Sequence, residues 1–127
     1  MNAYIVEDDE SMRFILKRLL KRNFPEIGRV GESETAEGAL EELPVFQADV
    51  VLVDISLPGM NGIELIQKLK PKNKDICILV VTGQEIELYK QQASDAGAHG
   101  IVSKSEFNEL LESVKILLAI RRNGGCG

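Results

Sequence analysis

Short apolar runs alternate along the chain with segments whose apolar residues recur at helical spacing. The two most continuous runs are Val50–Val53 and Ile76–Val81. Unbroken apolar runs of this length are typical of strands that a parallel sheet buries on both faces. The pattern therefore predicts two central strands, with further strands at Ala3–Val6, Arg29–Gly31 and Gly100–Val102.

One segment with a helical apolar stripe follows each of these strands. The residues expected to face inward are, in chain order, Met12, Ile15, Leu16, Leu19 and Leu20; Ala36, Ala39, Leu40 and Leu43; Leu65, Ile66 and Leu69; Ile86, Tyr89, Ala93 and Ala96; and Phe107, Leu110, Leu111, Val114, Leu117 and Leu118. We expect Pro25 and Pro44 to close the first two helices. We also expect Gly97 to cap the end of the fourth helix and Ser105 to cap the start of the fifth.

Alternation of five strands with five helices predicts an α/β fold. Right-handed crossovers then give a doubly wound parallel sheet with helices on both faces. Residues 1–121 hold all ten elements, which fits one domain in a chain of 127 residues. We expect residues 122–127, which are rich in glycine, to form a flexible tail or the start of a linker.

The composition is that of a globular protein, with 44% hydrophobic and 28% charged residues. The formal net charge of -5 disfavours binding of nucleic acid by this domain itself. No apolar run reaches the roughly 18 to 20 residues of a spanning helix, so we expect a cytoplasmic protein without membrane contact. Cys77 and Cys126 suggest neither a disulfide framework nor a metal knuckle, and we expect both to be free thiols.

Several polar residues stand where predicted strands end. Glu7 and Asp8 follow the first strand, Asp54 the third and Thr82 the fourth, and Lys104 lies just past the fifth. Doubly wound folds place their sites at the carboxyl ends of the strands. We therefore expect three carboxylates, a hydroxyl and an amine to converge at one edge of the sheet.

Crowded carboxylates repel one another unless a cation neutralises them. Magnesium is the natural occupant, because it prefers oxygen ligands and sits on one or two carboxylates plus a phosphate oxygen; Mn²⁺ could substitute. Asp54 could then attack phosphorus and form an acyl phosphate, while Lys104 spreads the negative charge of the phosphoryl oxygens.

Each of these residues also has a simpler interpretation. The acidic run from Glu7 to Asp9 could be a solvated turn that starts a helix. Thr82 alone could be an ordinary strand-end residue, and Lys104 alone a solvated surface lysine. Their combination favours a site. His99 is given no role.

Four motifs, in order, resemble those of the response regulator receiver domain over essentially the whole chain. They are the acidic turn Ile5–Asp9, the phosphoacceptor loop Asp54–Gly62, and the segments Val80–Gly83 and Val102–Lys104. The resemblance implies a flavodoxin-like fold with strand order 2-1-3-4-5 and a phosphorylation-dependent signalling switch.

The resemblance also assigns a role to each site residue. Magnesium would be held by Glu7, Asp8, Asp54 and the backbone carbonyl of Ser56. Asp54 would be the phosphoacceptor, and a sensor histidine kinase or a histidine phosphotransfer protein would supply the phosphoryl group from phosphohistidine. Asp9 receives no ligand role.

Thr82 would be the switch hydroxyl and Lys104 the phosphate-binding lysine. By the same resemblance the chain is not an enzyme beyond self-catalysed phosphotransfer and autodephosphorylation. A downstream protein or a second receiver would bind the surface of the fourth helix, fifth strand and fifth helix.

The sequence departs from the family pattern in three places. Ser105 follows Lys104, where the family usually has a proline in a cis peptide, so this peptide is expected to be trans or strained. Ile101 replaces a frequent aromatic residue. Ser56, together with Gln84, would alter the access of water to the phosphoryl group.

Other functions are left open. A nucleotide binder of the same fold needs a glycine-rich or serine-rich first turn, but the first turn here is acidic. A phosphohydrolase with an aspartyl nucleophile usually has a second acid in the nucleophile loop, which here reads Asp54-Ile55-Ser56. A degenerate receiver would bind its partner without phosphorylation.

Overall fold

The structure is a computed structural model that describes residues 1–127. Five parallel strands form one sheet in the order β2-β1-β3-β4-β5, and the predicted fold class and strand order are confirmed. The elements are β1 (Asn2–Val6), α1 (Glu10–Asn23), β2 (Arg29–Ser33), α2 (Ala36–Phe46), β3 (Val50–Val53), α3 (Gly62–Leu69), β4 (Cys77–Thr82), α4 (Ile86–Ala96), β5 (Gly100–Ser103) and α5 (Phe107–Arg122).

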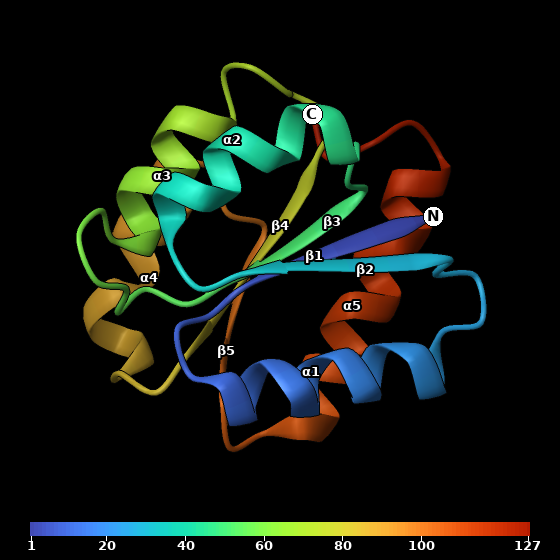
Figure 1. Cartoon of the computed structure of the whole chain (residues 1–127), viewed down its shortest axis with the longest axis horizontal. Coiled ribbons are helices and arrows are strands. Elements are labelled where there is room, and N and C mark those ends of the chain that lie inside the picture. Colours follow the sequence, from blue (N-terminus) through green and yellow to red (C-terminus); the bar gives the residue numbers. More distant parts are fainter.

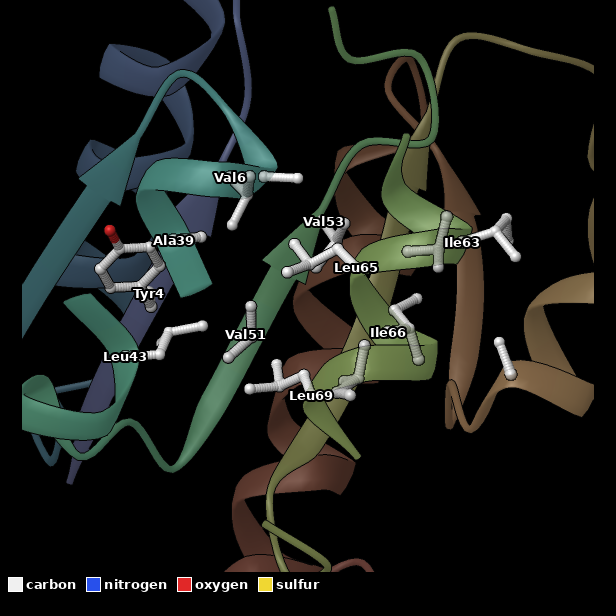
Figure 2. Packing of buried hydrophobic residues seen from close by; sticks show 14 of the residues in the cluster. Tyr4, Val6, Ala39, Leu43, Val51, Val53, Ile63, Leu65, Ile66 and Leu69 are labelled. Atoms are coloured by element: carbon white, nitrogen blue, oxygen red, sulfur yellow. The ribbon is translucent and has the colours of Figure 1, made fainter. Parts of the chain in front are cut away.

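The helices cover the sheet in two layers, with α2, α3 and α4 on one face and α1 and α5 on the other (Figure 1). Each face encloses its own hydrophobic cluster, of 19 and 18 buried residues. Figure 2 shows the first cluster, in which Leu65, Ile66 and Leu69 of α3 pack beside the β3 residues Val51 and Val53. These contacts explain the unbroken apolar runs of β3 and β4, because both faces of each strand are buried.

Strand register sets the position of the site. Val6 pairs with Val53, and Val53 pairs with Val80, so β1, β3 and β4 end near one another. Thr82 pairs with Ser103 at the end of β5. The loops after these strands therefore begin at one edge of the sheet.

Helix ends differ from the prediction in two places. Pro44 does not stop α2, which runs on to Phe46. A proline this close to the end of a helix removes only one main-chain hydrogen bond. Ser105 does not cap α5, because its hydroxyl bonds that of Ser103 and the cap position is Glu106. Gly97 caps α4 with a φ of 118°, as predicted.

Two predicted inward residues are exposed. Phe107 is 38% exposed because it begins α5 beyond the edge of the sheet, and Ile15 of α1 is also 38% exposed. Leu110, Val114 and Leu118 of α5 are buried as predicted.

The cysteine prediction is wrong. Cys77 and Cys126 form a disulfide with their Cα atoms 5.0 Å apart, and no free thiol exists. The bond forms because α5 ends near the edge of the sheet where β4 begins. Residues 122–127, expected to be a flexible tail or a linker, turn back there, and the N–H of Cys126 donates to the carbonyl of Asp75 at 3.0 Å.

Candidate functional site

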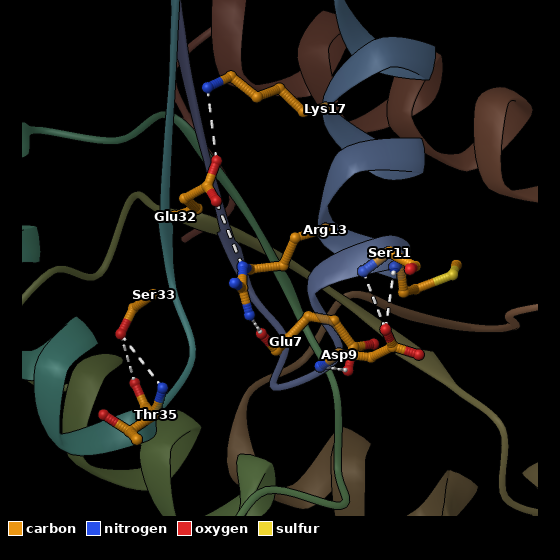
Figure 3. Close-up of polar contacts among 9 residues, drawn as sticks. Glu7, Asp9, Ser11, Arg13, Lys17, Glu32, Ser33 and Thr35 are labelled. Atoms are coloured by element: carbon orange, nitrogen blue, oxygen red, sulfur yellow. Dashed lines mark hydrogen bonds and ion pairs between the residues drawn. The ribbon is translucent and has the colours of Figure 1, made fainter.

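The three carboxylates of the acidic turn after β1 lie in different environments. Glu7 is buried, Asp8 is exposed, and Asp9 is the N-cap of α1, where its side chain accepts the N–H groups of Ser11 and Met12 (Figure 3). The interpretation as a helix-starting turn therefore fits Asp9, to which we gave no ligand role. Glu7 and Asp8 are left for the site.

Arg13 fixes the backbone of this turn from α1. Its Nη1 donates to the carbonyl of Glu7 at 2.8 Å, and its Nε lies 3.2 Å from Oε1 of Glu32 in β2 (Figure 3). This contact could not be predicted from the sequence, because it joins segments that only the fold brings together.

Asp54 lies directly beyond β3 and is 4% exposed. Its backbone N–H donates to the carbonyl of Val6 at 3.0 Å, which ties it to the end of β1. The start of α3 packs so tightly that a Cβ at Gly62 would collide with the carbonyl oxygen of Asp54. Glycine at position 62 is therefore a steric requirement of the site as well as a turn former.

The three predicted carboxylates do meet. Ligand oxygens of Glu7, Asp8 and Asp54 all lie within 4.8 Å of one another. The ammonium of Lys104 lies 2.5 Å from Oε1 of Glu7 and 3.0 Å from Oδ2 of Asp54. One cation thus bridges the two buried carboxylates, which could not otherwise both be charged at this separation without a large penalty.

Burial and neighbouring charges shift the pKa values in this cluster. Burial raises the pKa of Glu7 to about 7, helped by the charge of Asp54, although Lys104 and the N–H of Asp9 pull it down. Burial lowers the pKa of Lys104, but hydrogen bonds and charge from Glu7 and Asp54 outweigh burial and raise it overall. Lys104 is therefore held charged.

The donor set fits a hard divalent cation. It consists of carboxylate oxygens only, gathered from the ends of two adjacent strands, with no nitrogen or sulfur ligand among them. Magnesium prefers such oxygen ligands, whereas zinc sites usually include histidine or cysteine.

Thr82 is the last residue of β4, and Ser56 lies in the neighbouring loop between β3 and α3. Thr82 is fully buried, and its Oγ1 accepts the N–H of Gln84 at 2.9 Å. The side-chain amide of Gln84 donates to the hydroxyl of Ser56, also at 2.9 Å. The backbone N–H of Ser56 donates to Oδ1 of Asp54 at 3.3 Å. These contacts link the β3–α3 and β4–α4 loops.

Comparison with known proteins decides the family. The family model for the response regulator receiver domain matches residues 3–115. The chain belongs to this family. The transcriptional activator EvgA of Escherichia coli K12 is 29% identical over 99% of the chain and 59% of its own length. A cyclic di-GMP phosphodiesterase of Thermotoga maritima is 37% identical over 95% of the chain, but only 31% of its own length.

Solved structures agree with the receiver assignment. A CheY-like receiver domain protein from Methanospirillum hungatei superposes with a TM-score of 0.87 at 27% identity, over 98% of both chains. The response regulator TrrA of Thermotoga maritima, solved in complex with magnesium and beryllium fluoride, gives a TM-score of 0.79 at 32% identity over 91% of this chain and 97% of its own. The receiver spans about three fifths of EvgA, so the two compare over one domain only.

The receiver departs from its family where the sequence indicated. No peptide bond is cis, so the bond between Lys104 and Ser105 is trans. The N–H of Lys104 donates to the carbonyl of Thr82 at 2.9 Å, which holds the lysine beside β4 without a proline. Ile101 is half-buried and packs against the cluster under α2, α3 and α4.

One contact that holds the loop after Asp54 has no signal in the sequence. Glu37, in the first turn of α2, accepts the N–H of Met60 at 3.2 Å through Oε2. An α2 carboxylate thereby fixes the loop that follows Asp54.

The helices of the receiver are too short or too polar for any of them to span a membrane.

Proposed function

We propose that this receiver accepts a phosphoryl group on Asp54 from a phosphohistidine donor, with Mg²⁺ bound, and that phosphorylation changes its binding of partners. The observation that carries this proposal is the cluster itself, in which Glu7, Asp8 and Asp54 approach within 4.8 Å beside Lys104. We also propose that the receiver is cytoplasmic.

In the transfer, a carboxylate oxygen of Asp54 attacks the phosphorus atom. The bond between phosphorus and the donor imidazole breaks, and the imidazole nitrogen leaves with the electron pair. Mg²⁺, held by Glu7, Asp8, Asp54 and the carbonyl of Ser56, would neutralise charge on the phosphoryl oxygens. The buried carboxylate of Asp54 is held for attack by Lys104 on one oxygen and the N–H of Ser56 on the other.

Lys104 would change partners during this reaction. Without a phosphoryl group its ammonium bridges Glu7 and Asp54. Once a phosphoryl group is attached to Asp54, one of its oxygens offers the ammonium a new anionic partner. The movement of Lys104 would thus transmit the change in charge to β5, which ends at the preceding residue, Ser103.

The hydroxyl of Thr82 would complete the switch by turning towards the phosphoryl group. A hydrogen bond to a charged oxygen contributes about 1.5 to 3 kcal/mol. Reversing a 1:99 equilibrium needs about 5.5 kcal/mol, so Thr82 alone does not suffice. Lys104 and a bound partner would supply the remainder.

The partner surface that we propose is formed by α4, β5 and α5. It carries exposed apolar side chains, namely Leu88 of α4 (68% exposed) and Ile116 of α5 (54% exposed). Such residues favour a downstream protein or a second receiver as the partner. EvgA is named a DNA-binding activator, so a DNA-binding output in the same polypeptide is compatible with this surface.

Labelling with a small phosphodonor tests the proposal. Acetyl phosphate and Mg²⁺ should label one site per chain, detected by intact mass, and Asp54→Asn should abolish the label. Asp9→Asn is the matched control, because asparagine caps a helix as well as aspartate and position 9 has no ligand role. Release of many phosphate equivalents would favour a phosphohydrolase, and no labelling at all would favour a degenerate receiver.

A further inference from the structure

The C-terminal residues form a second organised site at the opposite end of β4 from Thr82. Cys77 begins β4 and is bonded to Cys126, 49 residues later in the chain. Both residues are buried, at 0% and 4% exposure. The sulfur of Cys77 also lies 3.6 Å from the carbonyl oxygen of Leu117, beneath α5.

Two polar side chains hold the backbone beside this disulfide. The ammonium of Lys70 donates to the carbonyl of Cys126 at 2.5 Å, and also to the carbonyls of Lys74 and Ile76. Nε2 of His99 lies 2.9 Å from the same Cys126 oxygen. Lys70 thus anchors the chain end and the segment leading into β4 at the same time.

The hydrogen bonds of His99 define its tautomer. Nδ1 accepts the N–H of Ile78 at 3.1 Å, so the proton of the neutral ring is on Nε2, which donates to Cys126. Together with the bond from the N–H of Cys126 to Asp75, three hydrogen bonds join Cys126 to the body of the receiver. The disulfide is the one covalent attachment.

The sheet of the receiver is complete before the segment that carries Cys126 begins. The family model ends at residue 115, before Cys126, and the sheet is completed by β5 at Ser103. Cys126 contributes only its own side chain to the 18-residue cluster under α1 and α5. Opening the disulfide would therefore change the position of the chain end while the sheet stays folded.

We propose that Cys77 and Cys126 form a redox-responsive site, at which a dithiol reductant opens the disulfide and releases residues 124–127 from the start of β4. Dithiols, either small molecules or the paired cysteines of a reductase, are the chemical class that this site takes. The released chain end leaves Lys70 and His99 without their common acceptor and uncovers the start of β4.

Reduction proceeds in two thiol–disulfide exchange steps. A thiolate of the reductant attacks Sγ of Cys126, which is 4% exposed, because Cys77 at the start of β4 is fully buried. Cys77 leaves as a thiolate and is protonated. The second thiol of the reductant then attacks the mixed disulfide and releases Cys126. Two electrons pass from the dithiol to the protein, and the reductant becomes a disulfide.

Thiol counting and amide hydrogen exchange on the whole chain test this proposal. Without reductant we expect no reactive thiol and a protected N–H at Cys126. With dithiothreitol under native conditions we expect two thiols per chain and at least a tenfold loss of protection at Cys126. Protection at Val80 and Val81, in the interior of β4, should not change, because the sheet stays intact.

Cys126→Ser provides the matched variant. It should lack protection at residue 126 with or without reductant, and its far-ultraviolet circular dichroism should equal that of the unaltered chain. Three results would overturn the proposal: two free thiols without reductant, thiols that appear only in denaturant, or a reduced chain whose residue 126 keeps its protection. The first excludes the disulfide, the second makes it purely structural, and the third separates it from the position of the chain end.

Discussion

Replacement of Glu7 by glutamine tests whether the raised pKa of this carboxyl makes the stability of the receiver depend on pH. Burial raises the pKa of this carboxyl from 4.5 to about 7 in the metal-free receiver. The folded state therefore binds a proton more tightly than the unfolded state. The resulting stabilisation is fully present below pH 4.5, falls as the pH rises, and is lost above about pH 7. A difference of about 2.5 pKa units corresponds to about 3 kcal/mol.

Urea unfolding of the chelator-treated receiver at pH 5 and pH 8 measures this effect. Glu7→Gln removes the titrating group, so its free energy of unfolding should not show this loss. From pH 5 to pH 8 the stability of the variant relative to the unaltered chain should increase by up to about 3 kcal/mol. Glu41→Gln, an exposed position on α2, is the charge-matched control and should show no such gain. A stability difference between Glu7→Gln and the unaltered chain that does not vary with pH would refute the reasoning.

Magnesium binding should follow the same titration, because a metal ligand must be deprotonated. With a pKa of about 7, Glu7 is ionised in about 9% of molecules at pH 6 and about 91% at pH 8. Calorimetry should therefore show about tenfold tighter Mg²⁺ binding at pH 8 than at pH 6. In Glu7→Gln this pH dependence should disappear. An equal pH dependence in both chains would mean that Glu7 is not a metal ligand.

Three other substitutions have defined outcomes. Gly62→Ala should lower the free energy of unfolding by about 1 to 3 kcal/mol and slow phosphorylation, measured by urea titration and labelling, because its Cβ would collide with the Asp54 carbonyl. Gln84→Ala removes the hydrogen bond to Ser56 and should shorten the lifetime of the phosphoryl group, followed by intact mass, because water gains access. Burial and then the charge of Lys70 lower the pKa of His99 below 6.5. The contribution of His99 to stability is therefore present above pH 6.5 and is lost as the pH falls. When the pH falls from 7.5 to 5.5, His99→Gln should lose less free energy of unfolding than the unaltered chain.

The strands and the meeting of the site residues could be predicted because one physical rule governs both. Burial on both faces makes β3 and β4 continuous apolar runs, and parallel strands bring their carboxyl ends to one edge. Glu7, Asp54 and Lys104 lie at such ends, so their convergence follows from the order of the elements. The bridging position of Lys104 between two carboxylates does not follow, because it depends on a side-chain conformation.

The disulfide could not be predicted from the pattern of residues along the chain. Cys77 lies inside an apolar run and looks like a small core residue, and Cys126 lies among glycines that favour a flexible tail. Their contact depends on the length and direction of α5, which returns the chain end to the start of β4. Pro44 was also misread, since the helix continues for two residues beyond it at the loss of one main-chain hydrogen bond.

Thr82 and Cys77 stand at opposite ends of one six-residue strand, about 17 Å apart at the usual rise per residue. β4 is buried throughout and is paired with β3 and β5. Three elements touch both regions. α3 begins against the carbonyl of Asp54 and is followed by Lys70, and β5 lies between His99 and Lys104. α5 begins three residues after Lys104 and packs over Cys77 at Leu117. A coupling between phosphorylation and the disulfide would therefore pass through these elements. Such a coupling is reciprocal: a tenfold effect of reduction on the equilibrium of phosphorylation requires a shift of about 30 mV in the reduction potential on phosphorylation.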